Sequence, residues 1–179
     1  MTDTMRSLAT LATLLADNEA SAISPQDIRD AILATVQPGY AEMYVSSSAA
    51  TTLADTTTWV DAGGTFTLTD ANNWEMTENG RLYYTGAADR EVNINASVSM
   101  TAAGVNVVVE WGVGVDGTVL TPSIIRRKIG TGSDVGAAAV IAHADISNGS
   151  YVSLMVRNIT SATTVTADLA NVVVFDFAA

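Results

Sequence analysis

The clearest pattern in this chain is an unbroken alternation of polar and apolar residues over positions 91–101. Because successive side chains of a β-strand point to opposite faces of a sheet, the alternation gathers five apolar side chains on one face. These are Val92, Ile94, Ala96, Val98 and Met100. The other face carries mainly Asn, Ser and Thr, which is typical of an antiparallel sheet with one face in water. The segment therefore predicts a long strand of a β domain.

Similar segments, separated by turn signals, continue to the C-terminal end of the sequence. Val105–Val115 has apolar residues at every odd position, and Asp116-Gly117 and Asn148-Gly149 are typical of hairpin turns. The last segment, Asn171–Phe177, is apolar on both faces. In an antiparallel sandwich such a strand needs a second covering layer, often another subunit. These segments, without an internal repeat, predict a mainly β protein with an antiparallel jelly-roll sandwich.

The first 38 residues show a different, helical pattern. Met5, Leu8, Leu11 and Leu15 recur at helical spacing within 5–17. A second helix is expected to begin at Ser24-Pro25, a good N-cap followed by proline, and to end at Pro38-Gly39. Neither helix is long enough to be stable alone in water. We therefore predict a helical N-terminal arm over 1–38 and a jelly-roll domain over 39–179.

Composition and charge narrow the possible partners. The chain has 179 residues, 48% of them hydrophobic, a net charge of −11 and no cysteine. Such a chain repels phosphate backbones, so we expect no nucleic-acid partner. The absence of cysteine excludes disulfides and thiolate metal sites. We recognise neither a signal peptide nor a segment able to cross a bilayer, and expect no membrane insertion.

Candidate catalytic residues do not combine into a known pattern. The one histidine, His143, lies in the apolar run Ala137–Ala144, and no Gly-x-Ser-x-Gly motif is present. The carboxylate pairs Glu75/Glu78 and Asp89/Glu91 are expected by chance in a chain with 19 acidic residues. We therefore expect a protein that is not an enzyme and that binds no cofactor.

Loop residues and aromatic residues give no stronger sign of a ligand. The glycine-rich segment 130–136 lacks the Lys-Ser/Thr that ends a phosphate-binding loop. Asp116, Asp134 and Asp145 lie near turns without the spacing of a calcium-binding loop, so no metal is expected. Four aromatic residues could form a sugar-stacking platform, although a core position is the more common role. They are Trp59, Trp74, Tyr83 and Tyr84.

A short basic segment stands out against the acidic background. Arg126-Arg127-Lys128 holds three of the eight basic residues. One interpretation is an edge strand protected by charge against further strand pairing. The other is a contact with an acidic surface on a partner or a neighbouring subunit.

The order of these signals resembles a known group of proteins. Ser-Pro-Gln-Asp-Ile-Arg-Asp-Ala-Ile (24–32) precedes Gly-Tyr-Ala-Glu-Met-Tyr-Val (39–45), Gly-Arg-Leu-Tyr-Tyr-Thr-Gly-Ala (80–87) and Asn-Gly-Ser-Tyr-Val-Ser-Leu-Met-Val-Arg-Asn (148–158). The pattern resembles capsid decoration and head-fibre proteins of tailed bacteriophages, whose jelly roll is similar to the tumour necrosis factor (TNF) and C1q folds. The resemblance implies homotrimers on the outside of the particle, with a short N-terminal segment docked to the shell.

These expectations form one functional hypothesis and one alternative. The hypothesis is a non-enzymatic, homotrimeric virion protein on the capsid surface, made in the host cytoplasm, with itself and the major capsid protein as partners. The alternative is a receptor- or carbohydrate-binding tip of a tail fibre, with a host surface glycan as partner. We expect capsid attachment through Leu8, Leu11 and Leu15. The expected trimer interface consists of Trp111, Val173, Phe175 and Phe177.

Overall fold

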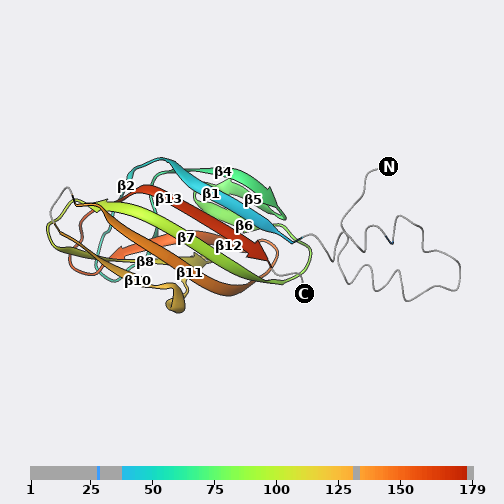
Figure 1. The fold of residues 1–179 in the computed structure, drawn as a ribbon. Coiled ribbons are helices and arrows are strands. Elements are labelled where there is room, and N and C mark those ends of the chain that lie inside the picture. The colour runs from blue at the N-terminus through green and yellow to red at the C-terminus, as the bar shows by residue number, and fades with distance from the viewer. Residues whose placement is uncertain (1–27, 29–37, 131–133, 177–179) are drawn as a thin grey trace, which may run out of the picture.

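The described part of the protein is a sandwich of two antiparallel β-sheets (Figure 1). The computed structural model describes residues 28, 38–130 and 134–176. Apart from Ile28, which is helical, both expected N-terminal helices lie outside these residues. The prediction of a mainly β, antiparallel fold is confirmed.

Sheet A has six strands in the order β11-β7-β13-β1-β4, with β2 paired to β13. Its strands are β1 (Tyr40–Ser47), β2 (Ala50–Thr51), β4 (Thr65–Asn72), β7 (Arg90–Ala102), β11 (Gly136–Ile146) and β13 (Val165–Asp176). Strand β7 contains the alternating segment, and Val92, Ile94, Ala96, Val98 and Met100 are all buried. The prediction that began from this segment is confirmed.

Sheet B has seven strands in the order β10-β8-β12-β6-β5, with β3 paired to β12 and β9 paired to β8. Its strands are β3 (Val60–Asp61), β5 (Trp74–Glu78), β6 (Arg81–Tyr84), β8 (Val107–Val115), β9 (Thr118–Val119), β10 (Ile125–Ile129) and β12 (Tyr151–Asn158). A short 3-10 helix, η1 (Thr121–Ser123), joins β9 to β10. Asp116 and Gly117 both have positive φ, as a tight hairpin turn between β8 and β9 requires.

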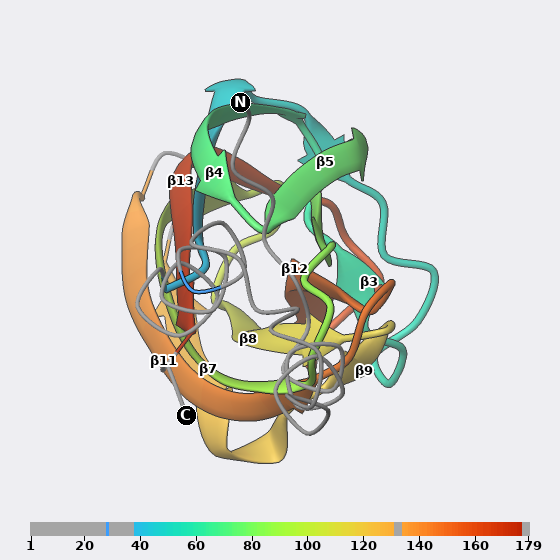
Figure 2. The same cartoon turned by 90° about the vertical axis from the view of Figure 1, so that its right-hand side faces the viewer.

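The core fills the space between the two sheets, which face each other in the end view of Figure 2. Its largest fully buried side chains include Trp111, Tyr84, Met43 and Ile94. Trp111 donates its indole N–H to the sulfur of Met100 in the opposite sheet, at 2.7 Å. Trp74 and Tyr84 also belong to this core, with ring centroids 5.1 Å apart. They are therefore not available as a sugar-binding platform.

The last strand is longer than the sequence pattern predicts. β13 begins at Val165, six residues before the expected start, and a register shift lies between Ala167 and Leu169. Because of the extra residue, the buried positions change from odd to even numbers along the strand. Val165 and Ala167 are buried before the shift, and Ala170, Val172 and Val174 are buried after it. A simple alternation pattern breaks at this point, so the sequence conceals the first half of the strand.

Candidate self-association surface

The outer face of sheet A carries almost no charge across three neighbouring strands. Registers between β11, β7 and β13 define four rows of side chains on this face. The rows are Ala137–Ser99–Leu169, Ala139–Ser97–Asn171, Ile141–Asn95–Val173 and His143–Asn93–Phe175. None of these positions holds Asp, Glu, Lys or Arg, although the whole chain has a net charge of −11.

Large apolar side chains project from this face into solvent. Leu169 is 67% exposed, Ile141 60% and Phe175 47%. Tyr44 and Tyr40 of the adjoining strand β1 extend the same face, in register with Asn171 and Phe175. Five large side chains exposed on one face of a sheet mark an interaction site more often than single residues scattered over the whole surface do.

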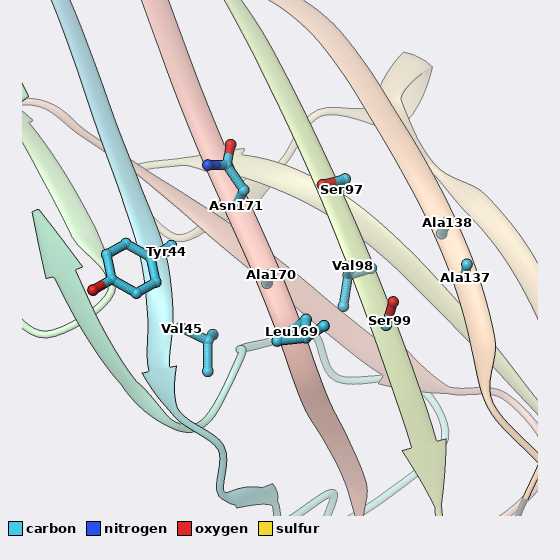
Figure 3. A pocket seen from close by; sticks show the side chains of 10 residues that line it. All are labelled: Tyr44, Val45, Ser97, Val98, Ser99, Ala137, Ala138, Leu169, Ala170 and Asn171. Carbon is cyan, nitrogen blue, oxygen red and sulfur yellow. The ribbon is translucent and has the colours of Figure 1, made fainter. Parts of the chain in front are cut away.

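Small side chains between these projections leave two shallow hollows. The first, of about 390 Å³, crosses β1, β13, β7 and β11 (Figure 3). Ser97, Ser99 and Ala137 lie on one side of it, and Leu169 and Tyr44 on the other. The second, of about 250 Å³, adjoins it over Asn95 and Ser97, beside Ile141 and Val173. Projections next to hollows give the face the relief that close packing against another surface requires.

Polar side chains on this face are partly satisfied within the subunit. Asn95 donates to Asn93 Oδ1 at 2.9 Å, and Asn171 donates to Glu42 Oε1 at 2.5 Å. Thr69 donates to the other oxygen of Glu42 at 3.2 Å. Because buried polar groups cost least when they are hydrogen-bonded, these contacts lower the cost of covering the face.

The structure separates the residues expected at a trimer interface. Val173 and Phe175 lie on the outer face of sheet A, and Phe177 lies outside the described residues. Trp111 is wholly buried inside the subunit, so its inclusion in the interface is corrected: its side chain belongs to the core. Leu8, Leu11 and Leu15, expected to attach to the capsid, also lie outside the described residues.

The strand that contains Trp111 is covered on both faces by its own chain. A Cβ at Gly112 would lie 2.7 Å from Val119 Cγ2 and 3.1 Å from Ser123 Oγ, so β9 and η1 pack against the outer face of β8. Val113 donates its backbone N–H to Ser123 Oγ at 3.0 Å. The odd positions from Val107 to Val113 face the core of the same subunit, and the outer face at Gly112 is covered by the same chain, so neither face of this part of β8 is open to a neighbouring subunit.

The outer face of sheet B presents aromatic rings that are already occupied by arginines. The guanidinium of Arg81 lies 4.5 Å from the ring centroid of Tyr151, and that of Arg157 lies 4.8 Å from the ring centroid of Trp59. Tyr83 packs against Tyr151 at 5.2 Å. Sugar stacking needs an open aromatic face, and these contacts leave Trp59 and Tyr151 poorly suited to it.

A buried carboxylate with two arginines lies on the same side of the sandwich. Glu110 is 3% exposed, and Arg126 and Arg157 each lie within hydrogen-bonding distance of it. Arg126 Nε donates to Oε1 at 3.0 Å, and Arg157 Nε donates to Oε2 at 2.7 Å. Burial by itself raises the pKa of Glu110, but hydrogen bonds from the two arginines outweigh it and hold the pKa below its usual value. The cluster connects β8, β10 and β12 through side-chain hydrogen bonds, so we assign it a structural role.

The remaining sequence candidates do not converge on a reactive centre. Asp116 accepts a hydrogen bond from the backbone of Tyr151, and Asp134 accepts one from the backbone of Gly130. His143 and Asp145 lie on β11 at the edge of sheet A. Within the described residues, no group of three or more His, Cys, Asp or Glu side chains could hold a metal ion. In the same part of the chain, no helix has the length and apolarity to span a bilayer.

Solved structures with the same fold belong to the TNF type. Eiger TNF from S. frugiperda superposes with a TM-score of 0.57 at 10% identity, covering 79% of this chain and 94% of its own. Murine APRIL gives a TM-score of 0.55 at 6% identity, covering 79% of this chain and 100% of its own. Identities this low establish the fold alone. The protein has a TNF-like jelly roll.

Comparisons of sequence alone add no closer relative. No protein-family model matches the chain, and no curated protein matches it. The functional argument for this TNF-like jelly roll therefore rests on its own surfaces.

Proposed function

We propose that this protein is a non-enzymatic structural protein that assembles as a homotrimer through the outer face of sheet A. The observation that carries the proposal is the absence of Asp, Glu, Lys and Arg from the four rows on β11, β7 and β13, in a chain with 19 acidic residues. A face that remained in water would gain solubility from charge. A face that another copy covers would avoid the cost of burying charge.

The role that we propose for the trimer is decoration of the outside of a phage capsid. The support from the sequence is the resemblance to phage capsid decoration and head-fibre proteins. That resemblance rests on segments 24–32, 39–45, 80–87 and 148–158. Structural support comes from where the two ends of the described chain lie. Tyr40 pairs with Phe175, so the start of β1 and the end of β13 lie at the same end of the sandwich. The described domain begins at Pro38, just before β1, so the preceding part of the chain is connected at that end, which suits an arm that docks to the major capsid protein.

The alternative role is a receptor- or carbohydrate-binding tip of a tail fibre. In this role the end that holds the start of β1 and the end of β13 would be attached to the fibre, and the opposite end of the sandwich would face the host surface. The aromatic residues on sheet B favour this role less, because arginines cover the rings of Trp59 and Tyr151. The two roles differ in location: one places the protein on the head and the other at the tail tip.

Two measurements test the proposal. Sedimentation equilibrium of the full chain at micromolar concentration should give the mass of three subunits, and a stable monomer would contradict the trimer. Immunogold labelling of particles should place the protein on capsids. Label confined to tail tips would support the alternative, and label on neither would contradict both roles.

A further inference from the structure

Two Asn-Gly pairs occur in this chain, and both lie in turns between consecutive strands. Asn79-Gly80 lies between β5 and β6, and Asn148-Gly149 lies between β11 and β12. In such a pair the side-chain amide of asparagine is open to attack by the next backbone nitrogen, because glycine has no side chain to hinder the approach. The structure gives the two pairs different surroundings.

Asn79 is held at both polar atoms of its side-chain amide. Its Oδ1 atom accepts the backbone N–H of Phe66 at 2.8 Å, and its Nδ2 atom donates to the carbonyl of Gly64 at 2.8 Å. Gly80 is buried, and a Cβ there would lie 3.1 Å from Cδ2 of Phe66, which belongs to the core. To bring the Gly80 nitrogen against the Asn79 amide carbon, both hydrogen bonds must break and backbone packed on the core must move.

Asn148 lies in a more open turn. Asn148 and Gly149 are both exposed, and a Cβ at Gly149 would meet no atom beyond its chain neighbours within 4 Å. Asn148 Nδ2 donates to the carbonyl of Gly86 at 3.1 Å, and the Gly149 N–H donates to the carbonyl of Tyr84 at 2.8 Å. Breaking these two bonds frees both the amide and the nitrogen that attacks it. Exposed turns open locally at a smaller free-energy cost than packed segments do.

We propose that Asn148 is a self-modification site, where the folded protein converts asparagine into aspartate or isoaspartate while Asn79 stays intact. The Gly149 nitrogen attacks the side-chain amide carbon of Asn148 and forms a new C–N bond. The bond from that carbon to Nδ2 breaks, and the proton lost from the Gly149 nitrogen leaves with it as ammonia. Water then opens the resulting succinimide ring at one of its two carbonyls, which gives aspartate or isoaspartate. Nothing is oxidised or reduced.

The conversion changes both the charge and the backbone of the turn. Each event adds a negative charge to a chain whose net charge is already −11. It also removes the Nδ2 atom that donates to Gly86, and isoaspartate adds a methylene group to the backbone between β11 and β12. The Tyr84 N–H donates to the carbonyl of Ser150 in the same turn, so we expect the modified protein to be less stable. The reaction needs a single subunit and goes beyond the proposed assembly.

Incubation of the intact protein in mildly alkaline buffer tests the site. Mass spectrometry of proteolytic fragments measures the replacement of the amide by a carboxyl group at each asparagine. Conversion should be about ten-fold or more faster at Asn148 than at Asn79, because the Asn79 turn must lose core contacts as well as hydrogen bonds. The rate should rise with pH, since the deprotonated nitrogen is the attacking form. Equal rates at the two sites, or no conversion at Asn148, would overturn the proposal.

The same chain unfolded in guanidinium chloride is the matched control. Without the fold, the two Asn-Gly pairs should react at similar rates. A selectivity that persists in the unfolded chain would assign it to the flanking sequence and overturn the structural argument.

Asn148→Gln is the slowly reacting variant, because its longer side chain would have to close a larger ring. Its thermal unfolding temperature should stay constant during an incubation in which that of the wild type falls. An equal fall in both proteins would contradict the predicted effect of the modified turn on stability.

Discussion

Asp176, the last described residue of the chain, accepts a hydrogen bond at 2.5 Å from the backbone N–H of Gly39, just before the first strand. The contact spans 137 positions and is buried. It lies beside the antiparallel pair β1–β13, where Asp176 in turn donates its backbone N–H to the Gly39 carbonyl at 2.9 Å. These two bonds fasten the two ends of the described domain to each other.

Gly39→Ala should lower the free energy of unfolding by about 1–3 kcal/mol, a typical cost of overpacking. An added methyl group would fall directly against Asp176 Oδ2 and the carboxyl carbon. Chemical denaturation followed by circular dichroism measures the change. In an Asp176→Ser background the cost of Gly39→Ala should shrink. Equal costs in the two backgrounds would show that the carboxylate is not the obstacle.

Glu110→Ala should destabilise the fold by about 1–2 kcal/mol, because it removes the charge-assisted hydrogen bonds that join β8, β10 and β12 while Arg126, 64% exposed, remains in contact with water. Glu75→Ala, at an exposed position, is the control and should change stability by no more than about 0.5 kcal/mol. Urea titration measures both. A small loss for Glu110→Ala would mean that solvent compensates Arg126 and Arg157 once the carboxylate is gone.

The same carboxylate predicts a pH dependence. Because the pKa of Glu110 is lower in the folded protein than in the unfolded chain, its contribution to stability is complete above the unfolded pKa of about 4.3. It is lost as the pH falls through the lower folded value. Stability of Glu110→Gln should therefore decline less steeply below pH ~4 than that of the wild type. Parallel curves in acid would contradict the lowered pKa.

Phe175→Asp and Ile141→Asp should dissociate the trimer into folded subunits, since each places a charge within the outer face of sheet A. Val105→Asp is the matched control: Val105 is 65% exposed but lies in the loop between β7 and β8. Light scattering measures the mass, and circular dichroism checks the fold. Dissociation by Val105→Asp as well, or by none of the three, would argue against this face as the interface.

Removal of residues 1–20 should leave a folded, trimeric β domain that no longer binds capsids. The expected attachment residues Leu8, Leu11 and Leu15 are removed, while the described domain begins at residue 38. Co-sedimentation with particles that lack the protein measures binding. Insolubility of the shortened chain would assign the segment to the fold, and undiminished binding would contradict the attachment role.

The sequence predicts which residues of each long strand face the core better than it predicts the role of the residues that face outward. The inward apolar residues of β7 follow from alternation alone, because burial inside one sheet is a local pattern. Its outward residues, such as Asn93 and Ser97, look like ordinary solvated positions. Only the register with Phe175 and Asn171 shows that they share a face with projecting apolar side chains.

Trp111 shows the opposite difficulty. An apolar strand with two covered faces suggests a subunit interface, yet here the second cover is the segment Thr118–Ile124 of the same chain. That segment follows a tight turn at Asp116-Gly117, which the sequence does predict. Its packing against Gly112 depends on the absence of a side chain there, and no periodic pattern carries that information.

Strand β11, at the edge of sheet A, carries no Asp, Glu, Lys, Arg or Pro over positions 136–144, and this has a consequence for how the protein is made. In the assembly that we propose, a newly folded subunit that has not met its neighbours exposes an alanine-rich edge strand, which can add a strand from an extended chain nearby. Subunits of the proposed trimer must therefore find one another faster than they find misfolded chains. Dilution, or a variant that weakens assembly, would then show itself first as aggregation during expression, and only afterwards as soluble monomer.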